Sequence, residues 1–370
     1  MMIESTYTNL TVKNFSYSPN FVAHRITKCV LSIAGVLLLS VLISAVNPIN
    51  AQQVGNFIHL DKRFQANSMI ESDSFGNILV STSAGIDKYN GYDFDLIPLT
   101  EIIGPDYIND VGAILEKDKE DRFWFTTYRG GLTRLDVNGQ QLQFGNSLSK
   151  LSVSSRITAI GTDSTYVWLG SANGTLHRFQ YSDSTFKKIV TLPSLLDTTQ
   201  VISNIAITSS DQLWMSTEGG KIYGYNTTLN QLEELEGSFT NSLTNYVRLV
   251  TDRKNRLWIS TELMGIYAYD PLTKHLDEIP TYNTASTPGR YPMFYSLFCD
   301  SQGNVWAGTD GDGLYKFGVD EQIETILRQN DRNKFSLSDN TISHINEDAN
   351  GNLWIVTKNG DIDILPNYNN

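Results

Sequence analysis

The stretch GNVWAGTDGDGLYKF, residues 303–317, places a tryptophan inside a short apolar run, followed by a Thr, glycines and a second apolar run. A close copy, GNLWIVTKNGDIDIL, occupies residues 351–365. Five earlier segments share the pattern, with anchors at Leu79, Trp124, Trp168, Trp214 and Trp258. Successive anchors lie 45, 44, 46, 44, 48 and 48 residues apart, and all six tryptophans of the chain stand in this register. The chain is therefore a sevenfold sequence repeat.

Each copy of the repeat predicts four short strands. In the fifth copy we expect them at residues 246–252, 256–261, 265–269 and 275–279. The second and third are apolar on both faces, which is typical of sheets packed between neighbouring sheets. Gly265 can supply the positive φ that a tight turn needs. Four strands in every ~45 residues, repeated radially, predict an all-β fold, a seven-bladed β-propeller with four-stranded antiparallel blades.

The repeated tryptophans are predicted to be structural. Each lies on the second strand of its blade, where two sheets meet face to face, and a large ring fills the wedge between them. The seventh copy ends at Leu365, after its third strand, whereas residues 56–60 (NFIHL) precede the first copy without a partner. We expect this N-terminal strand to close the seventh blade as its outer strand, which removes an open sheet edge.

Charge narrows the range of partners. The chain has 370 residues and a formal net charge of −12. The first 51 residues hold Lys13, Arg25, Lys28 and Glu4, so the remainder has 25 basic and 39 acidic residues, a charge of −14. A body this acidic is repelled by phosphate backbones, which argues against nucleic acid as a partner.

The N-terminal segment predicts export. Arg25 and Lys28 precede 18 uncharged, mostly apolar residues, Cys29–Val46. We interpret residues 1–51 as a signal peptide or an N-terminal membrane anchor, and residues 52–370 as a single propeller domain. The expected location is the periplasm, with residues 29–46 as an inner-membrane anchor if the segment is not cleaved. That segment would be the chain's only contact with a membrane.

The repeat resembles the two-component regulator propeller repeat. The strongest resemblance lies in DSQGNVW at Asp300–Trp306 and DANGNLW at Asp348–Trp354. This family supplies periplasmic sensor propellers to Bacteroidetes-type hybrid two-component systems. The resemblance implies a non-catalytic exported recognition propeller, the ligand-sensing part of a signalling system, for a glycan-derived ligand or a partner protein.

The sequence departs from that family in one respect. Family sensors usually carry two propellers, an immunoglobulin-like module, a membrane helix and a kinase, whereas this sequence contains one propeller. We therefore expect a free-standing relative or one piece of a split or truncated sensor. A separate membrane histidine kinase would then be the signalling partner. A periplasmic interaction scaffold and a lyase-like propeller enzyme stay open as alternatives.

No catalytic or metal motif stands out, so we predict no cofactor, no metal and no enzyme activity. Asp348–Asn352 resembles the start of a calcium loop, but Asn359 occupies the position of the bidentate glutamate, which favours a hairpin turn. Asp310–Gly313 (DGDG) also predicts a turn, with a divalent-ion site as the alternative. Streptogramin lyases share the seven-bladed form and use a His–Glu arrangement, and His344 and Glu347 could face the channel here.

A ligand site is expected on one face of the propeller. The loops between second and third strands, and between fourth and first strands, gather there around the channel mouth. Tyrosine rings stack on sugars, and charged side chains bind hydroxyl or uronate groups. The candidate ligand-binding residues are Tyr107, Asn109, Tyr128, Arg129, Asn173, Glu218, Tyr246, Glu262, Arg290, Tyr291, Asp310, Asp312 and Lys358.

Overall fold

The computed structural model divides the chain into two units, Met1–Asn50 and Ala51–Asn370. All the residues that the structure describes lie in the second unit: 56–65, 68–82, 85–98, 114–126, 132–136, 138–144, 156–193, 200–209, 211–236 and 247–366. The predictions for the N-terminal segment therefore fall outside the described residues. Within these ranges no helix is long and apolar enough to cross a membrane.

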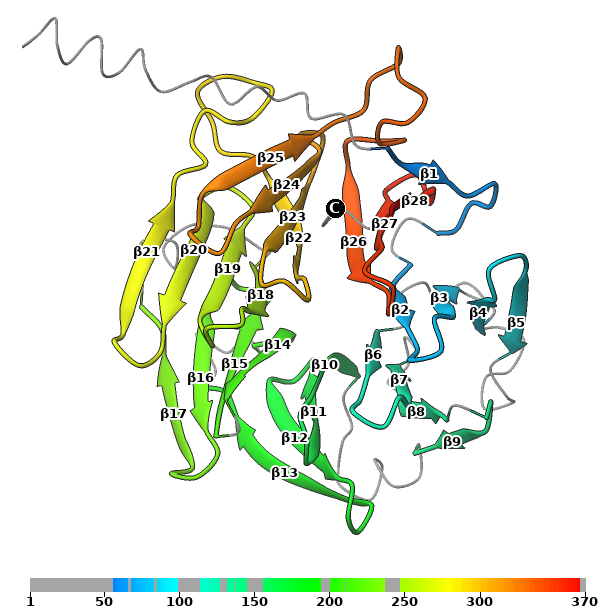
Figure 1. The fold of residues 1–370 in the computed structure, drawn as a ribbon. Coiled ribbons are helices and arrows are strands. Elements are labelled where there is room, and N and C mark those ends of the chain that lie inside the picture. Colours follow the sequence, from blue (N-terminus) through cyan, green and yellow to red (C-terminus); the bar gives the residue numbers. More distant parts are fainter. Residues whose placement is uncertain are drawn as a thin grey trace, which may run out of the picture. The chain divides into compact units, whose positions relative to one another are not determined.

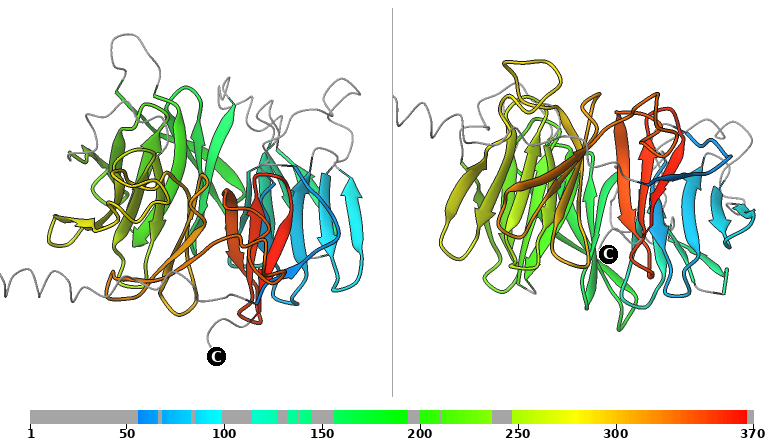
Figure 2. Two further views of the ribbon diagram at one scale, coloured as in Figure 1. Left: turned by 90° about the horizontal axis from the view of Figure 1, so that it is seen from above. Right: turned by 45° about the horizontal axis from the view of Figure 1, so that its top comes forward.

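The second unit is a seven-bladed β-propeller, as predicted (Figure 1). Each blade is a four-stranded antiparallel sheet in which neighbouring strands follow one another in sequence, except at the closing strand of the last blade. Figure 2 shows the blades edge-on, with their strands side by side in each sheet.

The first four blades hold four consecutive strands each. Blade 1 comprises β2 (Ile70–Ser72), β3 (Ile78–Thr82), β4 (Gly85–Tyr89) and β5 (Phe94–Pro98). Blade 2 comprises β6 (Leu115–Lys117), β7 (Phe123–Thr126), β8 (Leu132–Leu135) and β9 (Gln141–Gln143). Blade 3 comprises β10 (Ile157–Thr162), β11 (Tyr166–Ser171), β12 (Thr175–Gln180) and β13 (Thr185–Thr191). Blade 4 comprises β14 (Ile202–Ser209), β15 (Gln212–Thr217), β16 (Ile222–Asn226) and β17 (Gln231–Glu234).

The last three blades complete the ring. Blade 5 comprises β18 (Val247–Thr251), β19 (Leu257–Thr261), β20 (Gly265–Asp270) and β21 (His275–Ile279), close to the strands predicted for the fifth repeat. Blade 6 comprises β22 (Phe294–Cys299), β23 (Val305–Thr309), β24 (Leu314–Phe317) and β25 (Ile323–Leu327). Blade 7 comprises β26 (Ile342–Glu347), β27 (Leu353–Thr357), β28 (Ile362–Leu365) and, from the other end of the chain, β1 (Ile58–His59).

Each blade contacts both of its neighbours, through the first strands around the channel and through apolar clusters between the sheets. The first strand of each blade contacts the first strands of both neighbouring blades, including β2 against β26. Seven apolar clusters lie between successive blades, and each joins buried residues from two of them. The apolar second and third strands therefore bury both faces, as the repeat predicted.

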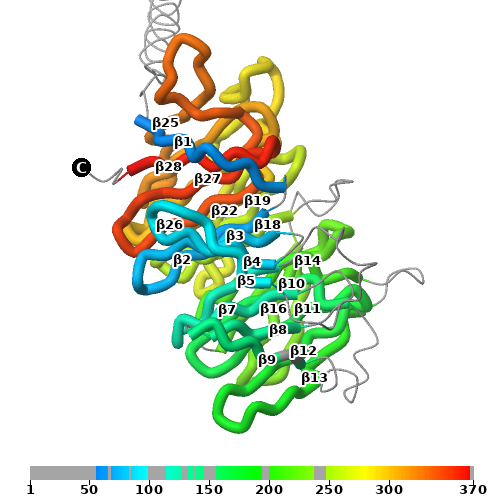
Figure 3. The backbone as a smooth tube through the Cα atoms, turned by 90° about the vertical axis from the view of Figure 1, so that its right-hand side faces the viewer, coloured from blue at the N-terminus to red at the C-terminus, as the bar shows by residue number. Residues whose placement is uncertain are grey.

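The N-terminal strand closes blade 7, which confirms the predicted partner of β28. Ile58 pairs with Ile364 and His59 with Asp363 in an antiparallel register, and Figure 3 shows β1 running beside β28. Phe57, 2% exposed, packs into the apolar cluster between blades 6 and 7. The observed strand is two residues long, shorter than the five predicted.

The tryptophans are structural, as expected, because all six are at most 5% exposed. In five blades the indole N–H donates to an aspartate at the end of the preceding strand, with Nε1–Oδ2 distances of 2.6–2.9 Å. The five pairs are Trp124–Asp118, Trp168–Asp163, Trp258–Asp252, Trp306–Asp300 and Trp354–Asp348. Each aspartate thus gives a buried donor its acceptor.

The same aspartate also builds the hairpin turn. Asp348 Oδ1 accepts hydrogen bonds from the backbone N–H groups of Asn350 (2.8 Å) and Asn352 (2.9 Å). Gly351 adopts a φ of +80°, a left-handed conformation that glycine adopts without strain. The DANGN segment is therefore an Asx-type turn, as predicted.

Candidate functional site

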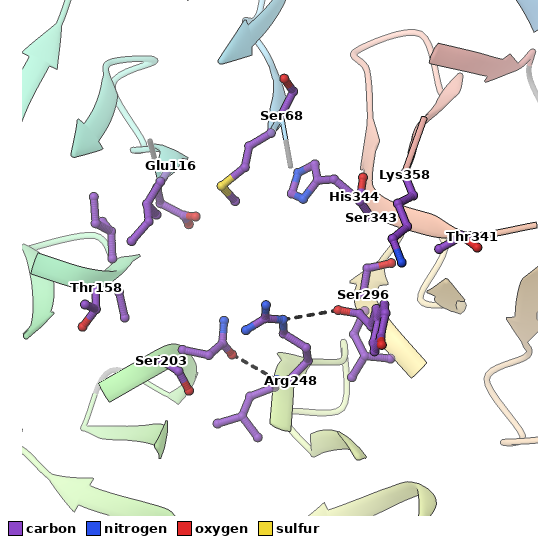
Figure 4. A pocket seen from close by; sticks show the side chains of 18 residues that line it. Ser68, Glu116, Thr158, Ser203, Arg248, Ser296, Thr341, Ser343, His344 and Lys358 are labelled. Carbon is purple, nitrogen blue, oxygen red and sulfur yellow. Dashed lines mark hydrogen bonds between the residues drawn. The ribbon is translucent and has the colours of Figure 1, made fainter. Parts of the chain in front are cut away.

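The candidate site is a cavity of about 570 Å³ in the central channel. Its lining side chains come from, or lie beside, the first strands of all seven blades, with one contribution from the loop after β27 (Figure 4). The lining residues are Ser68, Met69, Ile114, Glu116, Thr158, Ala159, Ile160, Ser203, Asn204, Arg248, Leu249, Tyr295, Ser296, Leu297, Thr341, Ser343, His344 and Lys358.

Four β-bulges shape this wall. The register of the first strand against the second shifts by one residue at Thr158, Ser203, Tyr295 and Ser343. The extra residue lies at the same place in blades 3, 4, 6 and 7, and all four extra residues line the cavity. Bulges re-aim side chains beside functional sites, so the strand irregularity itself supplies part of the lining.

Hydrogen bonds to backbone carbonyls connect one blade to the next around the channel. Thr158 Oγ1 donates to the Ile202 carbonyl over 2.6 Å, from blade 3 to blade 4. Arg248 Nε donates to the Tyr295 carbonyl over 3.3 Å, from blade 5 to blade 6. His344 Nε2 lies 3.1 Å from the Ile70 carbonyl, which joins blade 7 to blade 1. These contacts hold the channel-lining side chains in defined positions.

Burial shifts the pKa values of two channel-lining residues, His344 and Glu116. Burial lowers the pKa of His344 to about 4; the hydrogen bond to Ile70 opposes this shift and the Arg248 guanidinium adds to it. His344 is therefore neutral at pH 7. Burial, together with the Glu71 carboxyl, raises the pKa of Glu116 well above its usual range. Burial therefore favours the neutral, protonated form of Glu116.

Two of the predicted residues meet at the mouth of the cavity. Lys358, in the loop after β27, lies 3.7 Å from Asp310, in the loop after β23. Tyr295 and Thr341 donate to the same carboxylate over 3.3 and 3.4 Å. Lys358 also lines the cavity, so the loop face and the channel are continuous at this point.

Other predicted residues are engaged elsewhere on the rim. Arg290 donates to the fully buried Asp312 over 3.2 Å. Tyr291 donates to Glu278, on the outer strand of blade 5. Because Asp312 and Asp310 have different partners, the DGDG carboxylates do not converge. Among the described residues, no group of three or more His, Cys, Asp or Glu is placed to hold a metal ion.

The remaining predicted residues do not join this cluster. Asn173 supports its own turn, where its side chain accepts from Ser171 Oγ over 2.7 Å. Glu218 and Glu262 lie in the turns after β15 and β19. The last five lie outside the described residues and stay predictions: Tyr107, Asn109, Tyr128, Arg129 and Tyr246.

The structure gives His344 and Glu347 separate surroundings. His344 lines the cavity, whereas Glu347 accepts hydrogen bonds from the backbone N–H of Ser301 (2.6 Å) and from its hydroxyl (2.8 Å). Glu347 therefore helps to join blades 6 and 7 through the turn after β22.

Sequence reasoning missed most of the channel wall, Arg248 above all. The only sequence feature that could have indicated the channel wall was the presence of polar residues near the start of first strands, such as Ser203-Asn204 and Ser343-His344. That pattern is also what a solvated strand end shows.

The fold and the channel together define a seven-bladed propeller with a central cavity lined by both polar and apolar side chains. The family model described as two component regulator propeller matches residues 290–311 and 336–359. The matched segments lie in blades 6 and 7 and include Asp300–Trp306 and Asp348–Trp354, which confirms the resemblance found in the sequence. No curated protein matches the chain.

Several solved structures share the fold. The extracellular domain of a candidate one component system from B. thetaiotaomicron is 21% identical with a TM-score of 0.63, over 85% of this chain and 40% of that one. The corresponding domain of a candidate hybrid two component system from the same organism is 17% identical with a TM-score of 0.64, over 85% and 42%. This chain therefore spans about 40% of the length of these two structures.

An enzyme also shares the fold. Virginiamycin B lyase from Staphylococcus aureus is 15% identical with a TM-score of 0.60, over 83% of this chain and 98% of the lyase. The propeller architecture is therefore common to extracellular domains of one component and hybrid two component systems and to a lyase, and function has to be argued from the site.

Proposed function

We propose that this chain is a non-catalytic recognition propeller that forms the ligand-sensing part of a two-component signalling system. The observation that carries the proposal is the match of blades 6 and 7 to the two component regulator propeller repeat. The proposed location is the periplasm, reached through residues 1–51 as a cleaved signal or an inner-membrane anchor. The proposed signalling partner is a separate membrane histidine kinase.

The proposed recognition surface is the loop face around the channel mouth. Lys358 and Asp310 supply opposite charges there, from adjacent blades that both match the family repeat. Side chains of this kind hydrogen-bond to sugar hydroxyls, so the proposed ligand is glycan-derived. A partner protein that docks on the same loops is the second candidate.

Calorimetry of the full chain against a panel of neutral and acidic oligosaccharides tests the proposal. We expect one glycan to bind, and the double variant Lys358→Ala with Asp310→Ala to weaken that binding at least tenfold. The control removes the ion pair between Lys274, in the turn before β21, and Glu233 on β17, 3.1 Å apart, and should leave affinity unchanged. If no oligosaccharide binds and a protein co-purifies instead, the interaction scaffold replaces the ligand sensor.

The non-catalytic assignment is tested separately. The separate contacts of His344 and Glu347 argue against a paired general acid and base. Incubation of the full chain with a streptogramin should therefore leave the substrate intact. Turnover that disappears in the His344→Ala variant would replace the sensor with a lyase-like enzyme.

A further inference from the structure

We infer that the strand that closes the ring is held by a proton shared between His59 and Asp363. While this pair keeps the proton, β1 stays bound to β28, and loss of the proton as the pH rises loosens the strand. The inference goes beyond the proposed function, because it concerns the closure of blade 7 and involves neither the loop face nor the channel.

The His59 imidazole lies between two acceptor oxygens. Its Nδ1 lies 2.6 Å from Asp363 Oδ1, and its Nε2 lies 3.0 Å from the Lys334 carbonyl oxygen. The second carboxylate oxygen, Asp363 Oδ2, accepts from the backbone N–H of Ser338 (2.8 Å) and from its hydroxyl (2.9 Å). Ser338 thus contacts the carboxylate instead of the imidazole, so this is not the arrangement of a nucleophilic serine.

These contacts require one proton more than a neutral imidazole and an ionised carboxylate provide. A neutral imidazole has one N–H group and one lone pair, and a carbonyl oxygen cannot donate. The Nε2–H group must therefore face Lys334, and a second proton must lie between Nδ1 and Oδ1, on either atom. Without that second proton, a nitrogen lone pair would face an acceptor oxygen across one of the two contacts.

The closing strand depends on this pair because the strand is so short. β1 contains Ile58 and His59, and each makes one backbone pair with β28. Through its ring, His59 also joins β1 to the segment before β26, which holds Lys334. Loss of the proton would leave the fully buried Asp363 carboxylate beside a neutral imidazole, and a buried charge that loses its partner is strongly destabilising.

Both pKa shifts favour retention of the proton in the folded chain. Burial lowers the pKa of His59, but the hydrogen bond to Asp363 and the charge of its carboxylate outweigh burial and raise the pKa above its ordinary value of 6.5. Burial also raises the pKa of Asp363, against the hydrogen bonds from Ser338 and His59. The His59 side chain is 37% exposed, so the proton can exchange with the surrounding water.

The other charged groups around the imidazole are engaged with partners of their own. Asp361, whose charge also raises the pKa of His59, pairs with Arg63 over 2.8 Å. Lys62, which follows β1, pairs with Asp87 of blade 1 over 2.6 Å. The Lys334 ammonium lies over the ring of the next residue, 4.9 Å from its centre. Asp363 is therefore the main partner that controls the His59 proton.

The direction of the pH dependence follows from the raised pKa of His59. The folded chain binds the proton more tightly than the unfolded chain, so the stabilising effect is complete below pH 6.5. It is lost as the pH rises through the pKa of the folded state. The inference thus predicts a closing strand that is held firmly in mildly acidic surroundings and loosened in alkaline ones.

Hydrogen exchange on the full chain tests this prediction. The Phe57 amide donates to the Phe335 carbonyl over 2.9 Å and the Leu60 amide to the Ile362 carbonyl over 3.1 Å, so both report on the closing strand. Each rate is divided by the intrinsic amide rate at the same pH. We expect the protection of these two amides to be at least tenfold lower at about pH 9 than at about pH 6.

The outer strand of blade 5 is the matched control within the same molecule. His275 Nε2 lies 3.0 Å from Asp277 on β21, but both side chains are more than half exposed. Protection of β21 should therefore change by less than about twofold over the same range. Unchanged protection of β1 in the wild-type protein, or an equal loss in β21, overturns the proposal.

Two variants with opposite expected effects assign the pH dependence to the pair. His59→Gln leaves the buried carboxylate without a cation, so β1 should be at least tenfold less protected than in wild type at about pH 6, with no further loss at about pH 9. Asp363→Asn can accept from Ser338 through its oxygen and donate to the Nδ1 lone pair of a neutral imidazole. It should therefore keep β1 protected at about pH 9, where wild type does not.

Each outcome of the variant experiment decides the question. A wild-type pH dependence of β1 protection that persists in His59→Gln or in Asp363→Asn overturns the proposal. Glu71, whose pKa is also raised, is present in all three proteins, so it cannot produce a difference between them. If circular dichroism shows that His59→Gln does not fold, Asp363→Asn decides, and if neither variant folds, the comparison of β1 with β21 in the wild-type protein decides.

Discussion

In five blades an aspartate accepts a hydrogen bond from the tryptophan indole N–H. Blade 4 has Thr208 at the corresponding position. Among the described residues, Trp214 Nε1 and Gln212 Nε2 are buried and have no hydrogen-bond partner. In blade 6 the corresponding two donors, on Trp306 and Asn304, both donate to Asp300 Oδ2 over 2.9 Å. The loss of one carboxylate therefore leaves two donors unsatisfied in a single blade.

Restoring that carboxylate should stabilise the protein. The change is Thr208→Asp together with Asp211→Asn, because the fourth turn position has positive φ in blades 1, 2, 5, 6 and 7, as at Asn255, where φ is 61°. We expect the free energy of unfolding to rise by about 1–2 kcal/mol, measured by urea denaturation. Asp211→Asn alone should change it by less than about 0.5 kcal/mol. A double variant no more stable than wild type would contradict this account.

His344 should make stability depend on pH. Burial lowers its pKa from 6.5 to about 4, so the unfolded chain binds a proton that the folded chain does not. Its contribution is complete above pH 6.5 and is lost as the pH falls toward 4, by about 2 kcal/mol between pH 7 and pH 5. Glu71 acts in the opposite sense, because burial raises its pKa to about 7 and its protonated form favours the folded state.

The His344→Gln variant isolates this contribution, since Glu71 is present in both proteins. We expect the free energy of unfolding of the variant to fall less than that of wild type from pH 7 to pH 5. Urea denaturation at several pH values measures the difference. Replacement of the exposed His275 by Gln should leave the wild-type slope unchanged, and parallel curves for wild type and His344→Gln would show that the buried imidazole is not responsible.

The hairpins of the blades could be predicted from the sequence because the same residue types recur at the same positions of each repeat. The tryptophan, the preceding aspartate and the turn glycine recur in the sequence and give each hairpin its turn and its buried anchor. The bulges at Thr158, Ser203, Tyr295 and Ser343 were not predictable, because an inserted residue in a strand changes register without a distinctive residue type. For this reason the loops could be proposed as a site from sequence, and the channel wall could not.

The closing strand β1 offers a matched pair of substitutions. Phe57 is 2% exposed and Ile58 53% exposed, although the two are adjacent. Phe57→Ala should lower the free energy of unfolding by about 3–5 kcal/mol, because it leaves a cavity between blades 6 and 7. Ile58→Ala should cost less than about 1 kcal/mol. Thermal unfolding compares them, and equal effects would mean that the closing strand does not pack in solution.

The whole ring should unfold as one unit. Every blade buries apolar surface against two neighbours, so the removal of any blade exposes two faces, and no end blade exists from which unfolding can begin. We expect one calorimetric transition, with tryptophan fluorescence and circular dichroism changing together. Phe57→Ala should move this transition to lower temperature without dividing it. Two separate transitions would indicate blades of independent stability.

The register of β1 against β28 also sets how the propeller would respond to force. Because Ile58 pairs with Ile364 and His59 with Asp363, the chain enters β1 and leaves β28 at the same end of the strand pair. Tension applied between the segments before residue 57 and after residue 365 would therefore peel the two strands apart, one backbone pair at a time. Strands loaded in this direction separate at lower force than strands pulled along their length. The β1–β28 pair, which joins the two ends of the ring, is thus the part of the propeller expected to separate first under tension. It lies in blade 7, the blade that also holds Lys358 at the channel mouth.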